Sequence, residues 1–139
     1  TISDPGYKLV RDVAEAGFEV VSVPGASAVI AALSISGLPT DKFVFLGFLP
    51  KGNGKQQKLL EQFAQLHATF VVYESPFRIV KLLENISKAV GSGTKVAVVK
   101  EITKLHEEVM RGTAAELIKL LDGKKLKGEY VVLGNAAID

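Results

Sequence analysis

Apolar residues recur along this chain with spacings that alternate between those of helices and those of strands. From residue 41 onward, short apolar runs are separated by segments with an apolar residue every three or four positions. This pattern predicts the order β-α-β-α-β-β-α-β, with strands at 43–49, 69–74, 95–102, 107–112 and 129–133. Because one strand follows another directly, we expect an α/β fold with a mixed sheet flanked by helices.

The first part of the chain predicts only a helix, a strand and a second helix. Asp4 and Pro5 suit the N-cap and the first position of the first helix. The apolar run at 18–23 predicts a strand, and the second helix would extend to Gly37. Such a unit is too small to bury a sheet, and residues 38–42 have the composition of a linker. We therefore expect 1–38 to be the C-terminal part of a first α/β domain and 39–139 to be a complete second one.

Composition narrows the range of functions. The chain has 139 residues, a formal net charge of +2 and no cysteine, which excludes disulfides and thiolate metal sites. Its two histidines, His67 and His106, lack the spacing of metal ligands, so no metal is expected. No apolar run is long enough to span a bilayer and no signal peptide is visible, so we expect a cytoplasmic protein without membrane contact.

The stretch from Val23 to Ala28, with the sequence V-P-G-A-S-A, joins an apolar run to an Ala-rich helix. Small residues allow another group to approach the backbone, and the first N–H groups of a helix lack partners within that helix. Ligands bind in such crevices at the carboxyl ends of strands. The junction is either an ordinary tight turn or one wall of a ligand site.

Polar residues at two strand ends are the other candidates for chemistry. Tyr73 and Glu74 end one predicted strand, Lys100 and Glu101 end another, and Arg78 follows in the next helix. A carboxylate beside basic groups can hold a substrate or act as a base. The same residues can also form a solvated cluster of ion pairs at the rim of a sheet.

Two groups of lysines have the composition of phosphate-binding surfaces. Lys51, Lys55 and Lys58 surround a Gly-Asn-Gly loop that lacks the spacing of a phosphate-binding P-loop. A second group contains Lys124, Lys125 and Lys127. A solvated surface explains either group equally simply.

Several motifs together resemble one known family. They are I-S-D-P-G-Y, V-P-G-A-S-A, G-L-P-T-D-K-F with G-F-L-P, Y-E-S-P-F-R, K-E-I-T-K and K-G-E-Y. Their order and spacing resemble the tetrapyrrole (corrin/porphyrin) methylases over essentially the whole chain. Within the family they are most similar to the branch that methylates a ribose 2′-hydroxyl of 16S ribosomal RNA in the small ribosomal subunit.

The resemblance implies two α/β domains with S-adenosylmethionine (SAM) bound between them. It therefore implies that this chain, which opens at Thr1 without a methionine, lacks the first strands of the family and cannot methylate a substrate alone. The start of the last strand would form part of the cleft wall. The residues that match the family's cofactor contacts are Ser3, Asp4, Ser27, Ala28, Tyr73, Glu74, Gly112 and Thr113.

The chemistry implied for the family branch is in-line attack of a ribose oxygen on the sulfonium methyl group. Lys100 and Glu101 are the candidates for removing the hydroxyl proton, because they end a strand near the expected cleft. Arg78 would hold a phosphate or order the carboxylate of the Y-E-S-P motif by bidentate pairing, and Lys51 and Lys55 would also contact substrate. Phe77 stands where this branch often has histidine, which weakens any case for proton transfer at that position.

Two other interpretations remain open. A relative with this fold could methylate a tetrapyrrole carbon or a modified histidine of a protein instead of RNA. Alternatively, this chain could be a binding or dimerisation module without activity, because the apolar residues of its first part would favour a homodimer. These apolar residues are Leu9, Val10, Val13, Val20 and Val21.

Overall fold

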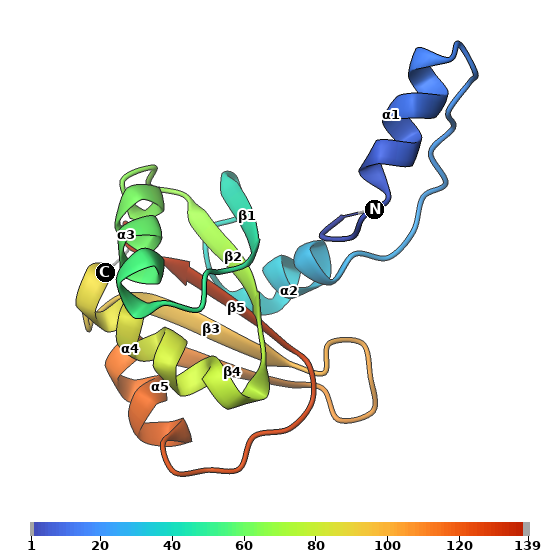
Figure 1. Cartoon of the computed structure of the whole chain (residues 1–139). Coiled ribbons are helices and arrows are strands. Elements are labelled where there is room, and N and C mark those ends of the chain that lie inside the picture. The colour runs from blue at the N-terminus through green and yellow to red at the C-terminus, as the bar shows by residue number, and fades with distance from the viewer. Residues whose placement is uncertain (1, 138–139) are drawn as a thin grey trace.

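The computed structural model describes residues 2–137, and five strands form its centre. The elements follow one another as α1 (Tyr7–Glu15), α2 (Ala28–Ser36), β1 (Phe43–Phe48), α3 (Asn53–Ala64), β2 (Thr69–Glu74), the 3-10 turn η1 (Pro76–Arg78), α4 (Ile79–Ala89), β3 (Lys95–Lys100), β4 (Glu108–Thr113), α5 (Ala114–Leu121) and β5 (Tyr130–Asn135). Figure 1 shows this order along the ribbon. The predicted α/β class with a mixed sheet is confirmed.

The strand order in the sheet is β1-β2-β5-β3-β4. Strands β1 and β2 are parallel, whereas β5 runs antiparallel to both of its neighbours and β4 runs antiparallel to β3. The last strand of the chain therefore lies in the middle of the sheet. Its first residue, Tyr130, pairs with Glu74 at the end of β2 and with Lys100 at the end of β3. This register brings the last residues of β2 and β3 and the first residue of β5 together at one end of the sheet.

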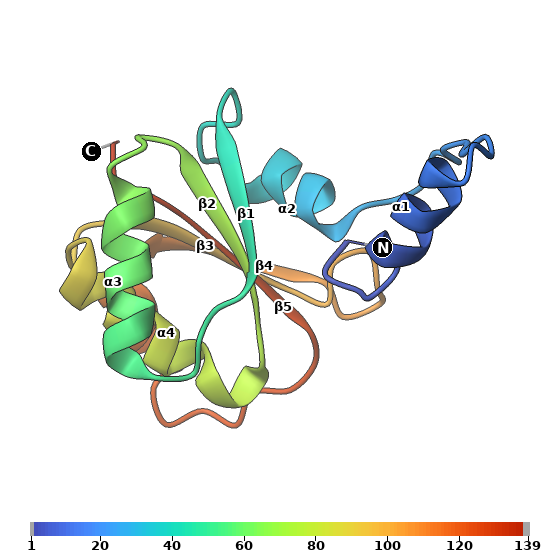
Figure 2. The ribbon, with the colours of Figure 1, turned by 45° about the horizontal axis from the view of Figure 1, so that its top comes forward.

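Helices cover both faces of the sheet, as Figure 2 shows. Helices α3, α4 and α5 pack on one face, where the buried side chains include Leu60, Leu83 and Leu117. Helix α2 packs on the other face through Val29 and Leu33. The predicted boundary at residue 38 stays a prediction, and the structure adds that α2, which precedes it, packs on the sheet formed by the residues after it.

Helix α2 has clear start and stop signals. The Ser27 hydroxyl accepts a hydrogen bond from the backbone N–H of Ile30 at 3.5 Å, and Gly37 closes the helix with a left-handed φ of 76°. The guanidinium of Arg111, on the edge strand β4, donates to the carbonyl oxygens of Ser36, at 3.1 Å, and Ile35. Both ends of the helix are thus held, and its end at Gly37 is the one predicted.

A capping box starts α5. The Thr113 hydroxyl accepts from the backbone N–H of Glu116 at 3.2 Å, and the Glu116 carboxylate accepts from the Thr113 N–H at 2.7 Å.

Three local predictions for the first part of the chain and for β1 are wrong. The segment 18–23 is not a strand, because within residues 2–137 it pairs with no other strand, and its residues are exposed. The first helix begins at Tyr7 after Gly6, so neither Asp4 nor Pro5 starts it. Strand β1 lies at an edge and is only partly buried, although its continuous apolar run predicts burial on both faces.

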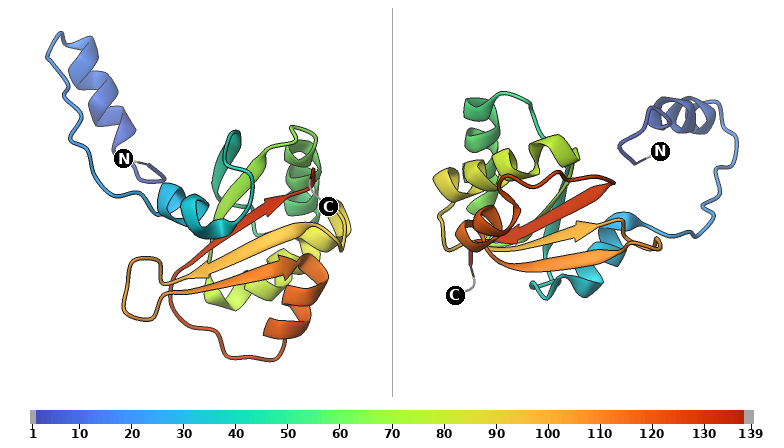
Figure 3. Two further views of the ribbon diagram at one scale, coloured as in Figure 1. Left: turned by 180° about the vertical axis from the view of Figure 1, so that it is seen from behind. Right: turned by 90° about the horizontal axis from the view of Figure 1, so that it is seen from below.

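The first helix and the segment after it extend away from the sheet, as Figure 3 shows from two further directions. Helix α1 has no buried residue. Leu9 is 69% exposed and Val21 is 71% exposed. Of the five apolar residues expected to be exposed in this part, Val13 is half-buried, and the other four are exposed.

We expect Gly134→Ala to destabilise the protein by about 1–3 kcal/mol, because a methyl group there would overlap the ring of the buried Phe70 on the paired strand. Thermal unfolding followed by circular dichroism measures the change. Gly93→Ala is the control, since a methyl group there meets no atom within 4 Å. Equal melting temperatures for the two variants would contradict this account of the sheet's packing.

Candidate functional site

A cavity of about 440 Å³, here called the main cavity, opens at the end of the sheet where the central strand β5 begins. The end of β1, the end of β2, the start of α2 and the turn after β3 all contribute to it. Its wall consists of Ala28, Phe48, Tyr73, Glu74, Ser75, Pro76, Ile102, Gly128, Glu129, Tyr130 and Val131. Its volume and mostly apolar wall are those of a small-molecule site.

The V-P-G-A-S-A junction reaches the main cavity through its last residue, Ala28. Ala28, the first residue of α2, is part of the wall, and the N-cap Ser27 precedes it. The buried residues Val29, Ala32 and Leu33 hold this end of the helix against the sheet. Because the first N–H groups of a helix have no partner within it, this end attracts anionic groups.

Aromatic side chains form one side of the main cavity. The ring of Tyr73 makes edge-to-face contacts with Phe45, at 4.8 Å between centroids, and with Phe48, at 5.7 Å. Both contacts come from strand β1, so the parallel pairing of β1 with β2 places Tyr73. This wall suits a flat ring such as a nucleobase.

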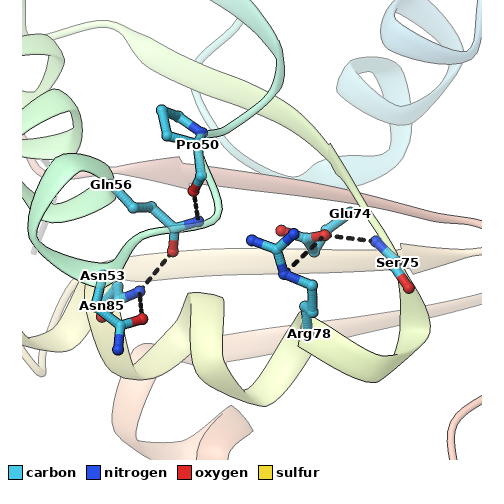
Figure 4. A network of polar contacts seen from close by, with 7 residues as sticks. All are labelled: Pro50, Asn53, Gln56, Glu74, Ser75, Arg78 and Asn85. Atoms are coloured by element: carbon cyan, nitrogen blue, oxygen red, sulfur yellow. Dashed lines mark hydrogen bonds and ion pairs between the residues drawn. The ribbon is translucent and has the colours of Figure 1, made fainter.

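Glu74 is fixed rather than mobile. Its side chain is only 4% exposed, and one carboxylate oxygen accepts a hydrogen bond from the backbone N–H of Ser75 at 2.7 Å. Arg78 Nε lies 4.0 Å from the same oxygen, as Figure 4 shows. The bidentate pairing predicted for Arg78 is not formed, because the guanidinium makes one contact with this carboxylate, through Nε alone and at 4.0 Å.

The loop after β1 is held by buried amides. Figure 4 shows Gln56 donating to the Pro50 carbonyl at 3.1 Å, while Asn85 donates to Gln56 at 2.6 Å and to Asn53 at 3.3 Å. This network fixes the start of α3 at the same end of the sheet as the main cavity. The predicted substrate-binding lysines of this loop and helix, Lys51 and Lys55, are both exposed and outside the main cavity wall.

Glu101 is tied to the segment that leads into β5. Its carboxylate accepts from the backbone N–H of Glu129 at 2.6 Å, and its own N–H donates to the Glu129 carbonyl at 2.8 Å. The side chain also lies so close to Gly128 that a Cβ there would contact it at 2.7 Å. Glu101 adopts a φ of 50°, which an L residue keeps only when its surroundings impose it.

These bonds bear on the predicted role of Glu101 as a base. The hydrogen bond from Glu129, and then the charge and hydrogen bond of Lys104, lower the pKa of Glu101 below its ordinary value of 4.5. Lys104 also contacts the Glu129 carboxylate at 2.6 Å, and its own pKa is raised. A carboxylate with a lowered pKa and an occupied oxygen is a weak base, so this arrangement favours a positioning role.

Lys100 does not line the main cavity. It lies in another cavity of about 240 Å³, here called the second cavity, on the opposite face of the sheet. The wall of the second cavity consists of Lys100, Glu108, Met110, Leu120, Leu121, Lys124, Lys125, Leu126 and Tyr130. Burial, followed by the charge of Glu108, raises the pKa of Tyr130, whose side chain lies among the buried residues on this face.

The structure separates the remaining predicted cofactor residues. Gly112 and Thr113 lie at the last residues of β4, where Thr113 pairs with Lys95 at the start of β3. They are therefore at the end of the strands that is opposite to the main cavity. Ser3 lies close to Gly47 of β1, where its hydroxyl would be 3.1 Å from a Cβ. Asp4 is exposed.

Two wall residues were missed by sequence reasoning. Phe48 lies beyond a register shift in β1 at Gly47, and Ile102 lies in the turn after β3. Both positions lie within motifs of the family resemblance, G-F-L-P and K-E-I-T-K, but an apolar residue at a strand end does not by itself indicate a site. The start of the last strand was expected in a cleft wall, and Gly128 to Val131 lie there.

Two absences concern the described part of the chain. Among residues 2–137, no three His, Cys, Asp or Glu side chains come together as they would around a metal ion. No helix within the same residues combines the length and apolar character needed to cross a membrane.

Comparison with known proteins identifies the family. The model of the Tetrapyrrole (Corrin/Porphyrin) Methylases matches residues 1–118. The chain belongs to the tetrapyrrole methylase family. The predicted resemblance is thus confirmed, and the junction at Ala28 and the Y-E-S-P segment that form the main cavity both lie within the matched residues.

Two relatives of more than 40% sequence identity carry the same name. The chain is 45% identical over 135 residues to the ribosomal RNA small subunit methyltransferase I of Vibrio cholerae, covering 95% of this chain and 46% of the relative. It is 42% identical over 132 residues to the protein of the same name from Synechocystis sp., covering 95% and 47%. The chain thus spans about half the length of these relatives.

A solved tetrapyrrole methylase shows the same fold. The uroporphyrin-III C-methyl transferase of Thermus thermophilus complexed with S-adenyl homocysteine has a TM-score of 0.60 at 20% identity, covering 94% of this chain and 57% of that one. At this identity the match establishes the fold alone.

We expect Glu101→Gln to reduce the acid sensitivity of the protein. The pKa of the Glu101 carboxyl is lower in the folded state than its ordinary value of 4.5. The carboxylate therefore stabilises the folded protein at pH values above 4.5, and this stabilisation is lost as the pH falls through the folded-state pKa. The variant lacks this contribution, so its melting temperature should fall less than that of the wild type between pH 5 and lower pH. Glu61→Gln, an exposed change on α3, is the control and should follow the wild type. Parallel curves for Glu101→Gln and the wild type would contradict the role assigned to this carboxylate.

Proposed function

We propose that this chain forms part of a SAM-dependent methyltransferase that acts on a ribose 2′-hydroxyl of 16S ribosomal RNA in the small ribosomal subunit. The observation that carries the proposal is its identity of 42–45% to relatives named ribosomal RNA small subunit methyltransferase I over 95% of its length. Such an enzyme would meet its substrate in the cytoplasm.

The main cavity has the properties that SAM requires. Its volume of about 440 Å³ lies within the range of small-molecule sites. One end of the cavity is the start of α2, which suits a carboxylate, and the aromatic side formed by Phe48 and Tyr73 suits an adenine ring. The exposed carboxylate of Glu129 pairs with Lys104 through one oxygen, which leaves its other oxygen to accept from a hydroxyl group. The residues present therefore fit the cofactor.

The mechanism assigns binding and orientation to the protein. When bound, SAM supplies a methyl group that is already activated by the sulfonium charge. Tyr73 and Ala28 would hold the cofactor, while the fixed carboxylate of Glu74 keeps the Ser75 backbone in place beside it. Orientation of two reactants in this way contributes much of the rate enhancement of group transfer.

Glu101 is proposed as a positioning residue. Its bonds to Glu129 hold the wall from Gly128 to Tyr130 in place, and its lowered pKa makes it a poor acceptor for a hydroxyl proton. Lys100 faces the second cavity and is separated from the main cavity by the sheet. Arg78, Lys51 and Lys55 remain proposed contacts to RNA phosphates outside the cavity.

RNA is favoured over a tetrapyrrole or a protein substrate for one reason. The relatives named for ribosomal RNA reach 45% identity, whereas the tetrapyrrole-methylating structure reaches 20%. Conservation of the fold at 20% identity leaves the substrate open.

We expect Ala28→Leu to reduce SAM affinity by at least about tenfold, because the larger side chain would fill the main cavity at the start of α2. The matched control is Ser34→Leu on the exposed face of the same helix. The measurement is calorimetry, made on a protein that contains this chain and has the length of its relatives. The same preparation is assayed for tritium transfer from SAM to small ribosomal subunits and to a porphyrinoid. Transfer to the porphyrinoid alone would contradict the proposed substrate, and an unaffected Ala28→Leu variant would contradict the cofactor site.

We further propose that the apolar surface of the first part of the chain is covered by a second copy. Soluble monomers rarely expose contiguous apolar surface of this kind, and Leu9, Phe18, Val21 and Val23 are all exposed. The surface lies on α1 and the extended segment behind it, away from the main cavity.

We expect this chain to sediment as a dimer, and we expect Leu9→Lys with Val21→Lys to shift it to a monomer, because a charge cannot be buried in an apolar contact without a partner. Analytical ultracentrifugation at several concentrations measures the shift. Lys81→Ala on α4 is the control and should leave the dimer intact. A wild-type chain that stays monomeric at every concentration would contradict the homodimer.

A further inference from the structure

The second cavity collects positive charge from two separate parts of the chain. Lys100 ends strand β3, whereas Lys124 and Lys125 lie in the loop between α5 and β5. Within residues 2–137, none of these three lysines forms an ion pair with an acidic side chain. The one carboxylate in the wall is that of Glu108, which stands opposite Lys100 in the register of β3 and β4. Three lysines and one glutamate thus line a concave surface.

The second cavity and the main cavity share a wall. The segment from Lys124 to Tyr130 lines the second cavity with its first three residues and the main cavity with its last three. Tyr130 belongs to both walls, because it begins β5 between the ends of β2 and β3. A polymer that reaches the main cavity therefore needs to extend over only a few residues of protein surface to reach the lysines.

We propose that the second cavity binds backbone phosphates of the RNA strand whose ribose enters the main cavity. The inference rests on the proposed function and adds the surface that holds the substrate. Lysine ammonium groups bind phosphate as point charges, and RNA carries one phosphate at every nucleotide. A site for phosphates on the other side of the shared wall from the reacting ribose would set the register of the strand without reading its sequence. Glu108 opposes this binding by repulsion.

The test measures binding of a single-stranded RNA oligonucleotide to this chain by fluorescence anisotropy over a range of KCl concentrations. For Lys124→Ala with Lys125→Ala we expect about a fivefold or greater loss of affinity at low salt. We also expect the slope of log affinity against log salt to fall in magnitude by about 1.4, since each lysine–phosphate contact to a single strand contributes about 0.7. Glu108→Gln should tighten binding by about twofold, because it removes the opposing charge.

Two controls separate this effect from folding and from general charge. Lys88→Ala removes one positive charge near the end of α4, at the end of the sheet that is far from both cavities. It should leave the RNA affinity and its salt dependence unchanged. Lys124→Arg with Lys125→Arg keeps both charges and should keep the affinity. Circular dichroism establishes that each variant is folded.

The outcomes are distinct from those of the methyl-transfer test. Wild-type affinity and slope in the Lys124→Ala, Lys125→Ala variant, or no RNA binding by the wild-type chain, would overturn the phosphate site even where tritium reaches the small subunit. Failure of tritium transfer to small subunits would overturn the proposed function while RNA binding stayed dependent on the lysines. An equal loss in Lys88→Ala would show a general effect of charge and would also overturn the site.

Discussion

The antiparallel insertion of β5 between β2 and β3 is the constraint on which the rest of the structure depends. It places the start of the last strand against the ends of two earlier strands, at the pairs of Tyr130 with Glu74 and with Lys100. Without that register the loop from Lys124 to Glu129 would have no fixed position. Tyr130 belongs to the walls of both cavities, so the position of this one strand shapes both.

Helix α2 depends on the same sheet. Its buried side chains contact the face formed by Val71, Ala97 and Val131, and Arg111 on the edge strand holds its last carbonyl groups. A helix nine residues long is too short to be stable alone, so this packing supplies most of its stability. The position of Ala28 at the main cavity is therefore a consequence of contacts made along the whole length of the helix, far from the cavity itself.

Local signals predicted most of the elements, and long-range pairing decided where those predictions failed. The capping box at Thr113 and Glu116 and the Ser27 cap act within one turn of helix, so the sequence reveals them directly. The apolar run at 18–23 has strand composition, but a strand needs a partner, and the described residues offer none. In the same way, the composition of β1 predicts burial, while its edge position depends on the order of the whole sheet.

The candidate site shows the same division between local and long-range information. Tyr73 and Glu74 are visible as polar residues at a strand end, and they do lie in the main cavity. The roles of Lys100 and Glu101 were not visible, because adjacent residues at a strand end differ in direction. Lys100 faces the helices α3 to α5, whereas Glu101 turns back through a positive φ to bind the Glu129 backbone. Two residues that sequence alone groups as one acid–base pair thus serve two surfaces, one that shapes the main cavity and one that carries charge. This separation keeps the charge of Lys100 on the face of the sheet away from the main cavity, whose wall is mostly apolar.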